Sequence, residues 1–308
     1  MCRLINDIGT FLTASGFEFS IQNRCGFDVI YAMTRNGGHI RVIFPIEITS
    51  GTVGQAAEDS RKAEEAVRMI SSADGYPIII TEDRWNRQRQ MMQERLLAHL
   101  EVFSQAYARN CEVRRIDKET AGGFLAANHS YGDAACKYRY GLFLKRHTGH
   151  IAKEMEADPS ACIKDNIGSL IAVATFSNAR KWIKEGREIR SYEWVRYASL
   201  PGLRVSGGMG KLLGTFINEV QPDDIMSYAD LEWSEGRVYD MLGFVEEEKK
   251  EAVGFEVDPT SWRRTALRGL QVKPEMTGKD IAIDGQAGSL YFVNFGSRKM
   301  RRKITEYK

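Results

Sequence analysis

The chain has 308 residues, enough for two domains that each bury a core of their own. Its 43 Lys and Arg nearly balance its 41 Asp and Glu, so no strong global field indicates a nucleic-acid binder. The five cysteines are an odd number without a C-x-x-C pair, which argues against a disulfide framework and a structural zinc site. Because the sequence shows neither a leader pattern nor an apolar run near the roughly 20 residues that span a bilayer, it predicts a soluble, cytoplasmic protein.

The first part of the chain, residues 1–107, predicts a small sheet-and-helix domain. A hairpin signal, Asn36-Gly37-Gly38, joins two strand-like runs that should pair antiparallel. Hydrophobic periodicity supplies the other elements. In chain order these are a helix over 4–14, strands over 27–33 and 39–48, a helix over 55–72, a strand over 76–81 and a helix over 84–103.

The stretch from Ile78 to Trp85, a buried strand that leads into a helix, resembles an endonuclease-like domain of some phage homing-type proteins. Such nucleases hold a divalent metal with an Asp on one strand and a Glu-x-Lys on the next. Asp28 and Glu47 stand at plausible positions, but Thr49 occupies the place of the lysine. We therefore predict no nuclease activity, and keep a metal-dependent nuclease acting through Asp28 and Glu47 as an alternative.

A glycine-rich loop lies at the centre of the second part of the chain. The run from Tyr192 to Ala198 predicts a strand, and the run from Lys211 to Val220 predicts an amphipathic helix. Glycines between them allow the first amides of that helix to face an anion, with the helix dipole favouring negative charge. The loop predicts a phosphate site, and a strand-to-helix turn without a ligand is the alternative.

Two motifs here resemble the GNAT acetyltransferases. The first is Arg204-x-x-Gly207-Gly208-x-Gly210, although Met209 stands where the family pattern has Gly or Ala. The second is Tyr239-Asp-Met-Leu-Gly243-Phe244, which follows a predicted strand over 225–230. The resemblance implies that Tyr239 protonates the departing thiolate of acetyl-CoA or another acyl-CoA. It also implies a cofactor-binding set of Arg204, Val205, Gly207, Gly208, Met209, Gly210 and Lys211.

By this resemblance, residues 108–308 form an α/β (α+β) domain, a GNAT-like mixed sheet with flanking helices. Further strands are predicted over 138–144 and 168–176, and we interpret His147-x-x-His150 between them as a solvated loop and not a metal pair. The segments Asn128-His-Ser-Tyr and Ser227-Tyr-Ala-Asp230 resemble phage Mom-type DNA-modification proteins. Asp230 and His129 are then candidates to bind or deprotonate an amine, with a structural hydrogen-bonding role as the alternative for His129.

The end of the chain is strongly basic. Its cations either contact nucleic acid or form a solvated tail, and the candidates are Arg298, Lys299, Arg301 and Arg302. The leading hypothesis is an N-acyltransferase that moves an acyl group from a CoA thioester to an amine, without a metal. A nucleic-acid-binding protein of phage origin that no longer catalyses is the alternative from another class.

Overall fold

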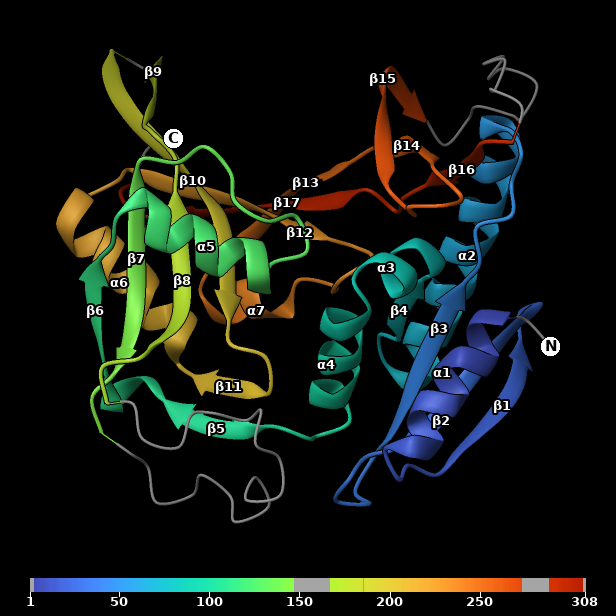
Figure 1. Cartoon of the computed structure of the whole chain (residues 1–308). Helices are drawn as coiled ribbons and strands as arrows, with labels where there is room; N and C mark the ends of the chain where they lie inside the picture. The colour runs from blue at the N-terminus through green and yellow to red at the C-terminus, as the bar shows by residue number, and fades with distance from the viewer. Residues whose placement is uncertain (1–2, 147–166, 185, 273–287, 307–308) are drawn as a thin grey trace. The chain divides into compact units, whose positions relative to one another are not determined.

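The computed structural model describes residues 3–146, 167–184, 186–272 and 288–306, with the backbone alone for 268–272. The chain forms two compact units (Figure 1). Unit 1 comprises Met1–Glu101, Tyr228–Arg237 and Glu246–Lys299, and unit 2 comprises Val102–Ser227, Val238–Val245 and Met300–Lys308. The first change of unit lies near the boundary that the sequence predicts at residue 107. The later segments of unit 1 come from the part that the sequence assigns to the second domain.

Unit 1 begins with a helix and a four-stranded sheet of order β1-β2-β3-β4. The predicted hairpin is confirmed, because β2 and β3 pair antiparallel, and β4 lies parallel to β3 after a helical crossover. The elements are α1 (Arg3–Ala14), β1 (Phe19–Arg24), β2 (Phe27–Met33), β3 (Ile40–Ile46), α2 (Val53–Asp74), β4 (Ile78–Thr81), α3 (Glu82–Arg87) and α4 (Arg89–His99).

Two expectations for this region are wrong. The helix over 84–103 is two helices, because Gln88 between α3 and α4 has φ −119° and ψ 42°, outside the helical region. Strand β1 was not predicted, because most of its residues are polar and none is fully buried. The element order is therefore α-β-β-β-α-β-α-α.

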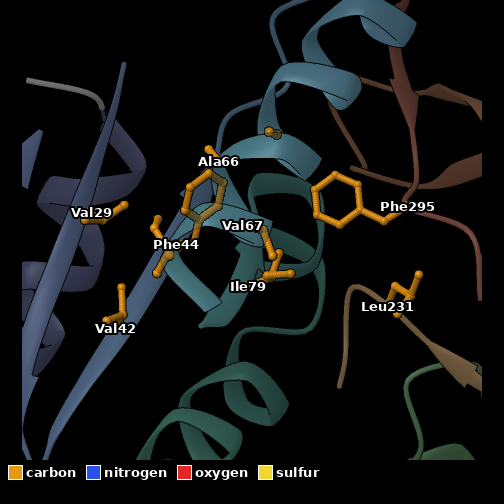
Figure 2. Close-up of a cluster of buried hydrophobic side chains, with 10 residues drawn as sticks. Val29, Val42, Phe44, Ala66, Val67, Ile79, Leu231 and Phe295 are labelled. Atoms are coloured by element: carbon orange, nitrogen blue, oxygen red, sulfur yellow. The ribbon is translucent and has the colours of Figure 1, made fainter. Parts of the chain in front are cut away.

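The main core of unit 1 lies between α2 and the sheet (Figure 2). Ala66 and Val67 of α2 pack with residues of β2, β3 and β4, among them Phe44 and Ile79. Two residues distant in sequence, Leu231 and Phe295, complete this cluster. The first third of the chain therefore does not build its core alone. A three-stranded sheet of order β15-β14-β16 also belongs to unit 1, with β14 (Ala252–Val257), β15 (Arg264–Val272) and β16 (Leu290–Val293).

Unit 2 contains most of an eight-stranded mixed sheet. Its strand order is β13-β17-β12-β10-β8-β7-β6, and β9 pairs with β10 alone. The strands are β6 (Cys111–Arg115), β7 (Tyr138–Leu144), β8 (Leu170–Phe176), β9 (Arg180–Lys184), β10 (Arg187–Ser199), β12 (Asp224–Asp230), β13 (Val245–Lys250) and β17 (Ser297–Lys303). A short parallel pair, β5 (Ser104–Tyr107) with β11 (Leu203–Ser206), forms a separate sheet.

Helices cover both faces of this sheet. From α5 (Lys118–Asn128), Leu125 packs with Val173 and Ala198. From α6 (Gly208–Val220), Phe216 stacks on Phe176, with ring centroids 3.9 Å apart. The predicted α/β class, a mixed sheet with flanking helices, is confirmed. In chain order its elements are β6, α5, β7, β8, β9, β10, α6 and β12, with β13 and β17 after them.

The basic run at the chain end is strand β17 inside the sheet order, so the alternative of a solvated tail is wrong. Its cations lie beside carboxylates. Arg298 pairs with Glu246 at 3.4 Å, Lys299 with Glu247 at 2.9 Å, and Arg301 with the fully buried Asp224 at 2.5 Å. Within the described part of the chain, no helix combines the length and apolar character needed to cross a membrane.

Candidate functional site

The parallel strands β10 and β12 are hydrogen-bonded over a short distance. Their paired residues run from Ser191 with Asp224 to Glu193 with Met226. Beyond Glu193, β10 continues to Ser199 with its ladder to β8 alone. One edge of β10 therefore presents backbone groups that β12 does not pair, and a ligand with amide groups of its own is able to bond to such an edge.

A bulge lies at the beginning of this edge. The register between β10 and β8 shifts between Trp194 and Arg196, so an extra residue interrupts the ladder there. The Trp194 side chain donates its indole N–H to the Arg196 carbonyl at 3.0 Å, and its own carbonyl accepts the Ser227 hydroxyl at 3.0 Å. The bulge is thus fixed by Trp194 and by a serine from β12.

The Tyr239 hydroxyl lies at the same place. It is 3.0 Å from Ser227 Oγ, and its ring packs edge-on against Trp194 and Phe244. Because Ser227 spends its single hydroxyl proton on the Trp194 carbonyl, Tyr239 must be the donor to Ser227. Burial raises the pKa of Tyr239 above its usual value. The phenol therefore keeps its proton at neutral pH, which a general acid requires.

The glycine loop meets the helix of Tyr239. Gly207 precedes α6 in the left-handed conformation, with φ 76°, and no side chain caps this helix end. The first amides of α6 are consequently available to an anion. A Cβ at Gly208 would lie 2.9 Å from a Val205 methyl group, so that position requires glycine. A Cβ at Gly210 would lie 3.4 Å from Leu242, three residues after Tyr239, so the start of α6 and the tyrosine belong to one neighbourhood.

Three further residues of the predicted cofactor set, Arg204, Met209 and Lys211, differ in exposure and in their contacts. Arg204 is exposed, with its guanidinium 5.3 Å from the Phe103 ring. Met209 lies in the first turn of α6 and is partly exposed. The Lys211 amide donates within the helix to Gly207, and its ammonium donates to the Ala108 and Cys111 carbonyls. Lys211 therefore connects α6 to Ala108 and to the first residue of β6.

The two candidate bases have other contacts. The Asp230 carboxylate, in unit 1, accepts from Arg84 at 3.1 Å and from the Glu232 amide at 2.9 Å. His129 follows α5, and its Nδ1 accepts the Tyr131 amide at 3.1 Å. Each of the two side chains thus accepts a backbone amide two positions further along the chain. The structure joins neither residue to the Tyr239 hydroxyl by a hydrogen bond.

The candidate nuclease carboxylates also have local contacts. Asp28 accepts the Asn23 side-chain amide at 3.0 Å, and Glu47 accepts the Leu4 amide in the first turn of α1 at 3.2 Å. Among the described residues, no group of three His, Cys, Asp or Glu side chains is placed to hold a metal ion. His147 and His150 lie outside the described residues.

Sequence reasoning missed two members of this site, Ser227 and Trp194. Ser227 stands in the Ser-Tyr-Ala-Asp motif, yet nothing in that motif assigns its hydroxyl to Tyr239, twelve positions later. The bulge at Trp194 cannot be predicted from local composition, because it depends on how β10 pairs with β8.

The chain matches no protein-family model and no curated protein sequence. It is similar to solved structures at low identity, among them the following three. A chain of the KacTA–DNA complex is 15% identical, with 45% of this chain and 86% of that chain covered and a TM-score of 0.28. A mutant AtaT toxin bound to the C-terminus of the antitoxin AtaR and acetyl-CoA is 11% identical, with 45% and 87% covered and a TM-score of 0.27. The histone acetyltransferase HPA2 and related acetyltransferase from Corynebacterium glutamicum is 11% identical, with 74% and 96% covered and a TM-score of 0.30.

Proposed function

We propose that the chain is a GNAT-like N-acyltransferase that moves an acyl group from a CoA thioester to an amine. The observation that carries the proposal is the Tyr239 hydroxyl, protonated and held by Ser227 beside the edge of β10 that β12 leaves unpaired. The glycine start of α6 in the same neighbourhood supports a site for the pyrophosphate of acyl-CoA.

Each part of the site has one task in this reaction. The first amides of α6, with Arg204 nearby, bind the pyrophosphate. The unpaired edge of β10 bonds the amide groups of the pantetheine arm and places the thioester near Tyr239. Holding both reactants in this geometry supplies most of the rate, because the reaction then avoids the entropy cost of a bimolecular encounter.

In the chemical step, a neutral amine attacks the thioester carbonyl carbon and forms the C–N bond. The C–S bond then breaks, and the sulfur leaves as a thiolate that takes the Tyr239 proton. The tyrosine recovers a proton from solvent. The attacking nitrogen loses its proton to a base, for which Asp230 and His129 stay our candidates, or to water. Mutation of each candidate tests that assignment separately.

The acceptor is the finer part of the proposal. The resemblance to Mom-type proteins makes an amine on nucleic acid the acceptor to test first, beside polyamines and peptides. The AtaT structure that resembles this chain contains acetyl-CoA, which makes acetyl-CoA the donor to try first.

The test of the acid is Tyr239→Phe, which keeps the ring against Trp194 and Phe244 and removes the proton donor. We expect turnover, measured as free CoA thiol, to fall by about 10²–10⁴-fold while acetyl-CoA affinity persists. Tyr197→Phe is the matched control. The Tyr197 ring also packs against Trp194, with ring centroids 6.2 Å apart, and its hydroxyl has no assigned role. Equal turnover in Tyr239→Phe and wild type would remove the tyrosine from the mechanism.

The phosphate site is tested by Met209→Asp. A carboxylate in the first turn of α6 interacts favourably with the helix dipole but repels a pyrophosphate. The substitution should therefore leave the stability of the fold unchanged and abolish ligand binding. We expect acetyl-CoA to raise the melting temperature of wild type and of the neutral control Met209→Asn, and not that of Met209→Asp. A shift of equal size in all three proteins would place the cofactor elsewhere.

A further inference from the structure

Strand β9 and the beginning of β10 form a two-stranded ribbon that extends past the ends of β7 and β8 (Figure 1). We define the β9–β10 ribbon as residues 180–184 and 187–190. Residues 180–190 of the sequence include five Lys or Arg and two Glu, a net charge of +3 against +2 for the whole chain. Positive charge therefore predominates in this ribbon, as it does in β17, whose seven residues include five Lys or Arg and no Asp or Glu.

The pairing register sorts these side chains onto two faces. Trp182 lies opposite Ile189, and Arg180 and Lys184 lie two positions to either side of Trp182 on the same strand. Successive residues of a strand point to opposite faces, so these three share one face. The Lys184 ammonium is 6.0 Å from the Trp182 ring centroid. One face of the ribbon therefore combines an aromatic side chain with cations.

Much of the ribbon is exposed. Trp182 is 38% exposed and Ile183 is 77% exposed, although both are large apolar side chains. Lys181, on the other face, forms a surface ion pair with Glu188 at 3.0 Å. Arg187 and Arg190 both form ion pairs with Asp223, the residue before β12. Lys184 lies beside the turn, opposite Arg187, and Lys181 and Arg180 follow toward the base of the ribbon, opposite Arg190 and Ser191.

The cations of β17 make a useful contrast. There, Arg298, Lys299 and Arg301 each lie beside a carboxylate inside a sheet, and Lys299 and Arg301 have only 18% of their side chains exposed. Phosphates would have to displace those partners. On the ribbon, Arg180 and Lys181 are exposed and Lys184 is half-buried, and Lys181 has 60% of its side chain exposed even within its ion pair.

We propose that the β9–β10 ribbon binds single-stranded nucleic acid, with phosphates at Arg180, Lys181 and Lys184 and a base stacked on Trp182. Cations that follow the backbone beside an aromatic ring are the combination that single strands bind. An anionic membrane surface is the rival partner. It is less well matched, because the ribbon presents one highly exposed aliphatic side chain, Ile183, with charged residues on both faces. This inference is independent of acyl transfer.

The test measures the binding of a fluorescein-labelled 20-nucleotide single strand by anisotropy, with DNA and RNA versions, across a salt titration and without acyl-CoA. The variant replaces Arg180, Lys181 and Lys184 with Gln. We expect it to bind at least about tenfold more weakly in 100 mM salt and to reduce the slope of log K against log salt by about 2, since each phosphate contact contributes about 0.7.

A control triple variant removes the same charge from the exposed side of α2, at Arg61, Lys62 and Arg68, and should bind as wild type does. Trp182→Ala should weaken binding by about 5- to 100-fold, and Trp182→Phe should restore part of it. Circular dichroism checks that every variant is folded. Equal losses in the two triple variants would overturn the proposal, as would no binding by wild type. Binding to phosphatidylserine vesicles but not to either strand would also overturn it.

Discussion

A buried cluster in unit 1 and a buried pair of side chains in unit 2 consist of different polar groups. In unit 1, Arg264 binds the carboxylates of Asp83 and Glu232, and Arg84 binds Glu232 and Asp230. In unit 2, the buried polar group beside Trp194 is a neutral pair of hydroxyls. Ionised groups removed from water require their partners to stay in place, whereas a neutral phenol retains a proton to give.

We infer that the ionised cluster of unit 1 has a structural role and that the neutral hydroxyl pair of unit 2 has a chemical one. The carboxylates of Asp83 and Glu232 are ion-paired with guanidinium groups, with side-chain exposures of 4% and 1%. Burial raises the pKa of Glu232, and the guanidinium groups oppose that rise. We interpret this cluster as a fixed link between three distant segments of unit 1, and the Tyr239–Ser227 pair as the part able to react.

The largest effect that sharpens the comparison is expected from Arg264→Met. The substitution leaves Asp83 without its bidentate partner in a buried setting, which should lower the free energy of unfolding by about 3–5 kcal/mol. Urea denaturation measures this, and Arg263→Met, at the neighbouring exposed position, is the control with an expected change within about 0.5 kcal/mol. A loss below about 1 kcal/mol for Arg264→Met would mean that the cluster is not a structural requirement.

A smaller effect comes from His99 at the end of α4. Burial, with Arg95 and Arg41 nearby, lowers the pKa of His99 to about 3. The folded protein therefore holds this ring neutral while the unfolded chain protonates it below its ordinary pKa of about 6.5. The contribution of the neutral His99 ring to the free energy of unfolding is fully present above pH 6.5. It is lost as the pH falls toward 3, at up to about 1.4 kcal/mol per pH unit.

The measurement for His99 is urea denaturation of wild type and His99→Gln between pH 7.5 and about 4.5. The variant should lose less stability than wild type over that range. His39→Gln is the control, because His39 is exposed and should follow wild type. Parallel pH profiles for wild type and His99→Gln would show that the ring is protonated in the folded protein.

The smallest effect is expected at the candidate nuclease residues. Glu47→Ala removes a hydrogen-bond acceptor of α1, so we expect a loss of about 1 kcal/mol in stability. We expect no cleavage of duplex or single-stranded DNA by wild type in Mg²⁺ or Mn²⁺. Cleavage that Glu47→Ala abolishes would show that the missing lysine at Thr49 is compensated.

The sequence predicted the parts of the fold whose signal is local. Residues 4–14 and 27–33 became α1 and β2, and the run from Lys211 became most of α6, because apolar spacing within one element reports the face that it buries. Strand β9 escaped this reasoning, because its residues are largely exposed and its pairing depends on β10.

Long-range partners explain the other differences. The basic run at 297–303 has the composition of a tail, but Asp224, Glu246 and Glu247 make it a strand, and they lie more than fifty positions away. The site divides in the same way. Tyr239 and the glycine loop were found by motif, whereas the hydrogen bonds of Ser227 and Trp194 depend on tertiary structure.

The position of Leu231 and Phe295 in the core of unit 1 has a practical consequence. A gene fragment cut after residue 107 would encode α1 to α4 and lack both side chains, leaving apolar surface of α2 and β4 open to water. Such a fragment should aggregate or remain partly unfolded. The complementary fragment would contain Leu231 and Phe295 but lack the sheet and helix against which they pack. Neither fragment is suited to separate expression, so function is best studied by point substitutions in the intact polypeptide.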